Sequence, residues 1–204
     1  MSTKIIITLF ILLTTSILFA QEYEATIYFH DGVSLSGYAE IKEDKNVYRE
    51  RLNNKILFRL TKNDEPDVWD GIMIDRIVFE DFGIDATYQY VEIISRNSVE
   101  KYLFEIITEG EVTLYYEYTN NWTFYTDMNN QPMGGYNDID RTLWLKRKGE
   151  KELTTIGRNK VKIAEYFDQC PGIVKKLKTN EFGYNNLKDI VEYYNDICAG
   201  YDDY

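Results

Sequence analysis

Cysteine is the residue type with the most distinct chemistry in this chain of 204 residues, which contains two of them. A disulfide between Cys170 and Cys198 would close a loop of about 29 residues and stabilise the fold by roughly 3.6 kcal/mol in the chain-entropy model. Two alternatives stay open: a pair of free buried thiols, or a redox-active or nucleophilic cysteine. We expect the disulfide, because there is no Cys-x-x-Cys motif and the single histidine, His30, is distant in the sequence.

Carboxylates are abundant, with 34 Asp and Glu residues, so a pair suited to acid–base catalysis could be assembled from many positions. The sequence has none of the Gly-x-Ser-x-Gly, Gly-x-x-x-x-Gly-Lys and His-Glu-x-x-His motifs that position a nucleophile, a phosphate or a zinc ion. We therefore expect no catalytic residue, no metal and no cofactor. A carboxylate-based hydrolase that uses acidic residues at positions 127–140 remains an alternative.

Aromatic residues concentrate in one stretch, at positions 115–125. Aromatic side chains with polar tips can stack on sugar rings or on a partner chain. The same residue types are favoured in strands and fill cores, which is the structural explanation of the pattern. The candidate ligand-binding residues are Tyr115, Tyr116, Tyr118, Trp122 and Tyr125.

Residues 1–20 have the pattern of a signal peptide. Lys4 precedes a long apolar run, and Leu18 and Ala20 suit the two recognition positions of the cleavage site. Cleavage after Ala20 would leave 204 − 20 = 184 residues in an oxidising compartment, which is the periplasm, the cell surface or the extracellular space. No later stretch reaches the roughly 18 apolar residues of a membrane span, so we expect no transmembrane segment after cleavage.

The net charge restricts the class of partner. The whole chain carries −11, and loss of Lys4 with the leader gives −12. Nucleic-acid binding depends on clustered Lys and Arg, so we expect no nucleic-acid partner. An envelope protein or a glycan is the partner class that remains.

The β-rich part of the chain divides into two predicted units. In an N-terminal β subdomain over residues 21–82, several short strands show alternation of apolar and polar residues, as at Ala25, Ile27 and Phe29, before a turn at His30-Asp-Gly32. Short strands with turns between them, including a hairpin turn at residues 52–54, predict a small curled sheet similar to an SH3 or Sm barrel.

A second β meander is predicted over residues 83–157. Strands at 112–118 and 122–126 are expected to be joined by a hairpin at residues 119–121, where Asn residues favour a turn. Residues 127–140 are rich in Asn, Gly and Asp, so we expect them to form one long loop.

The last segment, residues 158–204, changes to a helical period. Ile163, Phe167 and Cys170 share one helical stripe, and Ile190 and Cys198 lie on a second. Both cysteines should therefore face the core, as a staple within a tail of two to three short helices. Pro171 suits the first turn of one of these helices. The expected fold class is mainly β with a C-terminal helical tail, an α+β protein built on antiparallel meanders.

Two motifs resemble a known group of proteins. The stretch Glu109-Gly-Glu-Val-Thr-Leu-Tyr115 and the tail from Tyr166-Phe-Asp-Gln-Cys-Pro171 to Tyr194-Asn-Asp-Ile-Cys198 are similar to uncharacterised exported β-rich proteins of Gram-negative bacteria. Those proteins end in Phe-x-Asp-Cys-Pro followed by Tyr-Asn-x-x-Cys, and here Gln169 is inserted before the first cysteine. The resemblance implies export and a disulfide but assigns no activity.

Together these patterns predict an exported protein that acts through non-catalytic binding or as a structural protein of the cell envelope. A glycan- or peptide-binding module that uses the aromatic strands is the first alternative, and the hydrolase is the second.

Overall fold

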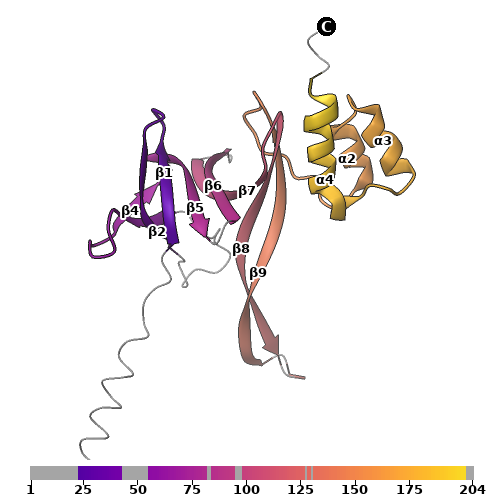
Figure 1. Ribbon diagram of the computed structural model, residues 1–204. Coiled ribbons are helices and arrows are strands. Elements are labelled where there is room, and N and C mark those ends of the chain that lie inside the picture. The colour runs from indigo at the N-terminus through magenta and orange to yellow at the C-terminus, as the bar shows by residue number, and fades with distance from the viewer. Residues whose placement is uncertain are drawn as a thin grey trace, which may run out of the picture.

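The computed structural model contains one antiparallel sheet of nine strands, followed by short helices (Figure 1). The expected class, mainly β with a helical tail, is therefore confirmed. The expected signal peptide and the hairpin turn at residues 52–54 lie outside the residues that the structure describes. The described residues are 23–42, 55–81, 84–94, 98–126, 128–129 and 131–200.

The strands are numbered in chain order, and their order in the sheet is β4-β3-β2-β1-β5-β6-β7-β8-β9. Their bounds are β1 (Tyr23–Phe29), β2 (Ser34–Ile41), β3 (Lys55–Arg59), β4 (Asp67–Asp70), β5 (Ile74–Asp81), β6 (Ile84–Ile94), β7 (Val99–Thr108), β8 (Val112–Thr126) and β9 (Pro132–Arg147). The helices are α2 (Lys160–Tyr166), α3 (Pro171–Lys178), the short 3₁₀ turn η1 (Tyr184–Asn186), α4 (Leu187–Tyr193) and the wider π-helical turn η2 (Tyr194–Cys198).

The N-terminal half of the sheet curls around its own apolar core. The side of the sheet that carries Ala25 and Ile27 is called the inner face, and these two residues are buried with Phe58 of β3. Gly71, which follows β4, lies so close to the ring of Tyr90 in β6 that an added Cβ would be 2.7 Å from it. The edge of the sheet thus curves back toward β6.

This curl belongs to one continuous sheet. β5 pairs with β6 from Arg76↔Gln89 to Asp81↔Ile84. The expected boundary at residues 82–83 therefore falls between two paired neighbouring strands.

The sequence prediction for the segment 119–140 is wrong. β8 runs without interruption through residues 119–121, since Thr119 pairs with Asp140 and Asn121 pairs with Asp138. β9 begins at Pro132, so most of the expected loop at 127–140 is strand. Asn and Gly favour turns when they are considered singly, but aromatic and Thr neighbours and a long in-register partner outweigh this preference.

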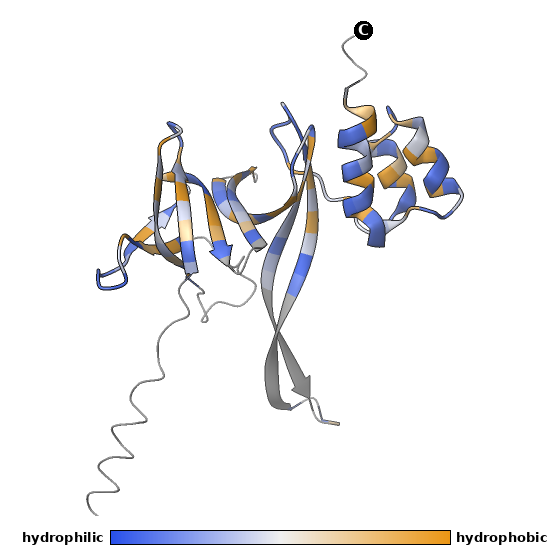
Figure 2. Ribbon diagram, viewed as in Figure 1, coloured by the Kyte–Doolittle hydropathy of each residue, from blue (hydrophilic) through white to orange (hydrophobic). Residues whose placement is uncertain are grey.

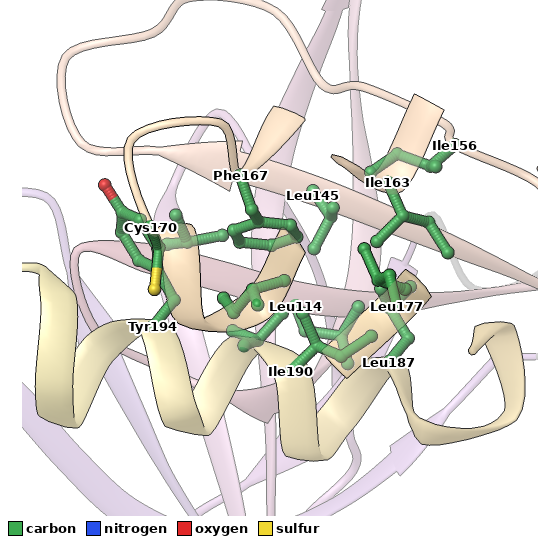
Figure 3. Close-up of a cluster of buried hydrophobic side chains, with 13 residues drawn as sticks. Leu114, Leu145, Ile156, Ile163, Phe167, Cys170, Leu177, Leu187, Ile190 and Tyr194 are labelled. Carbon is green, nitrogen blue, oxygen red and sulfur yellow. The ribbon is translucent and has the colours of Figure 1, made fainter. Parts of the chain in front are cut away.

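The helices cover the inner face of β8 and β9. Leu114 and Leu145 project from the two strands into a core that contains Ile163 of α2, Phe167 just after α2, and Ile190 of α4 (Figure 3). Apolar and polar residues alternate in bands along the helices (Figure 2). The residues of both predicted stripes are buried or partly buried, although α2 ends at Tyr166, before Phe167 and Cys170. α3 begins at Pro171 as expected.

Asn195 attaches the last helix to the sheet. Its Nδ2 donates to the carbonyl oxygen of Val112 at 2.8 Å, and its Oδ1 accepts from the Val112 N–H at 2.9 Å. The side-chain amide thus imitates a neighbouring strand at the start of β8. Gly110 leaves the necessary space, because an added Cβ there would lie 2.3 Å from the Asn195 Nδ2.

The two sulfurs lie at disulfide distance, in agreement with the pair expected from the sequence. Cys170 and Cys198 have an S–S distance of 2.01 Å and a Cα–Cα distance of 5.7 Å. Cys170 is fully buried before α3, and Cys198 ends η2. The bond therefore joins two elements of the helical tail to each other.

We predict that the Asn195 contact stabilises the whole fold. Asn195→Ala leaves both backbone groups of Val112 without this partner, so the free energy of unfolding should fall by roughly 2–3 kcal/mol. Gly110→Ala should cost a similar amount by displacing Asn195. Gly200→Ala is the control, since an added Cβ there meets nothing within 4 Å. Urea denaturation measures all three, and equal stability of the two glycine variants would contradict the prediction.

We also predict that the disulfide forms in the oxidised protein. Replacing both cysteines by serine should lower the free energy of unfolding by about 2–4 kcal/mol. Thiol labelling of the denatured wild-type protein, read by intact mass, should add no label without reductant and two labels after reduction. Two labels without reductant would show that the thiols are free.

Candidate functional site

A polar hollow on the opposite, outer face of the sheet is the candidate site, and it is called the outer groove. It encloses about 760 Å³ and is lined by residues that include His30, Asp75, Gln89, Glu109, Tyr115 and Lys146. A neighbouring hollow of about 600 Å³ shares His30 and Asp75 and adds Tyr28 and Arg76. The two hollows together span the sheet from the β1–β2 turn to β9.

A β-bulge brings Asp75 to this face. Tyr28 pairs with Arg76, whereas Phe29 pairs with Ile74, so Asp75 is an extra residue in β5. Bulges redirect side chains and are frequent next to functional sites. Here the bulge gives the outer face two consecutive charged side chains, Asp75 and Arg76, where a regular strand would give one.

A chain of hydrogen bonds crosses the groove from β8 to β5. The Tyr115 hydroxyl donates to Gln89 Oε1 at 3.0 Å, and Gln89 Nε2 donates to Asp75 Oδ2 at 3.4 Å. Burial raises the pKa of Tyr115 to about 12, an effect that a hydrogen bond with Thr113 partly offsets. The phenol therefore remains a hydrogen-bond donor at neutral pH, and the chain ends on a carboxylate.

Two further contacts fix polar side chains at the two hollows. Arg76 donates to Glu109 in bidentate geometry at 2.7 and 3.1 Å, and this hydrogen bonding raises the pKa of the guanidinium. The His30 ring forms a hydrogen bond through Nε2 to the Gly71 carbonyl oxygen at 3.1 Å, behind a turn closed by Gly32 at φ +86°. The Glu109 carboxylate is thus already engaged by the Arg76 guanidinium.

The aromatic residues predicted from the sequence do not share one surface. Tyr115 is buried on the outer side of β8, and alternation places Tyr116 and Tyr118 on the inner side. The rings of Tyr116 and Tyr118 are 6.3 Å apart, and the Tyr118 hydroxyl donates to Glu105. Trp122 and Tyr125 lie farther along β8, where the structure describes the backbone.

The residues that form the outer groove were not predicted from the sequence as a site. Asp75, Gln89 and Lys146 are single polar residues in three separate strands, and no motif links them. Only the bulge and the strand order bring them together. The one sequence feature that could have indicated the site is the pair of oppositely charged residues Asp75 and Arg76 between two isoleucines, which interrupts the alternation of the strand.

Three further observations bear on the class of protein. Among the described residues, no group of three or more His, Cys, Asp or Glu side chains could hold a metal ion. No helix in the described ranges is both long and apolar enough to cross a bilayer. No protein-family model, curated protein or solved structure matches this chain.

Tyr115 predicts a loss of stability at alkaline pH. The unfolded chain has its tyrosine pKa near 10, while the folded value is about 12. Between these values the unfolded state releases a proton that the folded state keeps. The contribution of Tyr115 to the free energy of unfolding is therefore complete below pH 10 and is lost as the pH rises to about 12. Between pH 10 and pH 12, the free energy of unfolding of Tyr115→Phe should therefore fall by about 2 kcal/mol less than that of the wild type, as measured by chemical denaturation. Identical pH profiles would contradict the assignment.

Proposed function

We propose that this chain is an exported, non-catalytic binding protein that holds a neutral, carbohydrate-like ligand in the outer groove. The hydrogen-bonded chain Tyr115–Gln89–Asp75 is the observation that carries the proposal. A disulfide in the helical tail is compatible with the oxidising compartment that the leader sequence predicts.

The size and polarity of the groove favour a sugar. A volume of about 760 Å³ is within the range of small-molecule sites. Hydroxyl groups need donors and acceptors side by side, and Gln89 offers both beside the acceptor Asp75. Lys146 adds a cationic donor.

The charge balance favours a neutral ligand. The groove is lined by four acidic and four basic side chains, namely Asp75, Glu92, Glu109 and Glu150, and Lys101, Lys146, Arg147 and Lys148. A ligand with a strong net charge of either sign would face repulsion from half of these groups. A neutral ligand can instead be recognised by directed hydrogen bonds.

The same geometry favours binding over hydrolysis. A glycosidase needs two carboxyl groups, one of which donates a proton to the leaving group. Glu109 is held by Arg76 at 2.7 Å, and Asp75 accepts from an amide. Both carboxylates are therefore already engaged by protein groups, and neither is positioned as a proton donor to a leaving group.

We predict that a neutral oligosaccharide binds this groove. The chain starting at residue 21 would be tested on an array of neutral oligosaccharides, and each hit would be measured by isothermal titration calorimetry. Asp75→Asn and Gln89→Leu should weaken binding at least about tenfold, because each leaves ligand hydroxyls without a partner.

Asp85→Asn is the matched control, since Asp85 is an exposed carboxylate of β6 that does not line the groove. It should bind with wild-type affinity, and thermal denaturation would confirm that all variants are folded. The proposal is wrong if no neutral oligosaccharide binds, or if Asp75→Asn and Asp85→Asn behave alike.

A further inference from the structure

We propose that the free edge of β8, at residues 118–126, binds an extended basic segment of another polypeptide as an added β-strand. This interaction surface goes beyond the proposed sugar binding and is independent of it. It depends on backbone pairing in the ribbon formed by β8 and β9.

The pairing of β8 with β7 ends early. Glu105↔Tyr116 is the outermost pair between these strands, although β8 continues to Thr126. Beyond Tyr116, the described part of the chain pairs β8 only with β9. Figure 1 shows the two strands extending away from the rest of the sheet as a ribbon.

The hydrogen bonds of neighbouring residues show which backbone groups point to the free edge. Leu145 of β9 exchanges bonds of 2.9 and 2.8 Å with Thr154, so its backbone groups point away from β8. Its partner Leu114 must therefore point away from β9. Val112, two residues earlier, does so as well, since its N–H and C=O pair with Asn195.

Because this orientation alternates along a strand, the even-numbered residues of β8 present their backbone N–H and C=O groups to the free edge. These residues are Tyr118, Asn120, Trp122 and Phe124. Thr119, Asn121 and Thr123 instead point to β9. The edge thus has regularly spaced donors and acceptors that suit one extended strand of about eight residues.

The two edges of the ribbon differ in protection. Exposed edges are normally blocked by Pro, Lys, bulges or short length. Residues 117–126 contain no Pro, Gly, Lys or Arg, whereas β9 carries Pro132, two glycines and Arg141. Two-stranded ribbons are marginally stable in water, so a third strand would stabilise the outer ribbon.

Charge identifies the occupant as a basic segment of a different chain. Residues 117–141 hold four acidic residues and one basic residue, which gives a net charge of −3 for the ribbon. A second copy of this chain, with a net charge of −11, would be repelled. A segment that alternates Lys or Arg with β-branched residues meets both the charge and the strand requirement.

Hydrogen exchange measured residue by residue tests this proposal. The probe is a soluble eight-residue peptide that alternates lysine with valine or threonine. Saturating peptide should slow exchange at least about tenfold for the amides of Tyr118, Asn120, Trp122 and Phe124, while Thr119 and Asn121 should be protected already in the free protein. The same peptide with alternate N-methyl groups, or with glutamate for lysine, should bind at least about tenfold more weakly.

Asn120→Pro and Asn137→Pro form a matched pair of variants. Asn120 has its N–H at the free edge of β8, and Asn137, opposite Trp122, has its N–H at the outer edge of β9. Each proline substitution removes one backbone N–H that points away from the partner strand, and it leaves the hydrogen bonds between β8 and β9 intact. Only Asn120→Pro should weaken peptide binding, by at least about tenfold.

Three results would overturn the proposal: unchanged exchange of the even-numbered amides, equal loss of binding in both proline variants, or protection that rises with protein concentration without peptide. The last result would identify a second copy as the occupant. None of these measurements involves the outer groove, so sugar binding can fail or succeed independently.

Discussion

The register of β8 against β9 is the constraint on which the rest of the structure depends. Leu114↔Leu145 and Tyr115↔Trp144 are consecutive pairs, and their side chains serve opposite faces. The first pair supports the helical tail, and the Tyr115 phenol completes the hydrogen bonds of the groove. A slip of one residue would exchange the two faces, so the helices would lose their apolar base and the groove its phenol.

The end of β9 connects the helical tail to the groove. Arg147 lies 5.4 and 4.9 Å from the ring centroids of Tyr166 and Tyr194 and donates to the Tyr166 carbonyl oxygen at 3.0 Å. Arg147 and the preceding residue, Lys146, both line the groove. Arg147 therefore contacts the helical tail and the groove at the same time.

The sequence predicts the features that depend on local periodicity. The helical stripes at Ile163 and Ile190 and the strand alternation at Ala25 were legible because each reports one buried face. The strand conformation of residues 119–121 could not be predicted in this way, because it depends on pairing with β9. The groove could not be predicted from the sequence either. Its geometry depends on one extra residue, Asp75, and a β-bulge produces no periodic pattern in the sequence.

The disulfide joins two parts of the helical tail and none of the sheet. Tension applied to the C-terminal end of the chain would pass from Cys198 directly to Cys170, and then through α2 to β9. The segment 171–197, which includes α3, α4 and Asn195, would carry none of that load. The contacts of this segment with β8 are thus shielded from mechanical force, and the α2–β9 connection becomes the element that bears it.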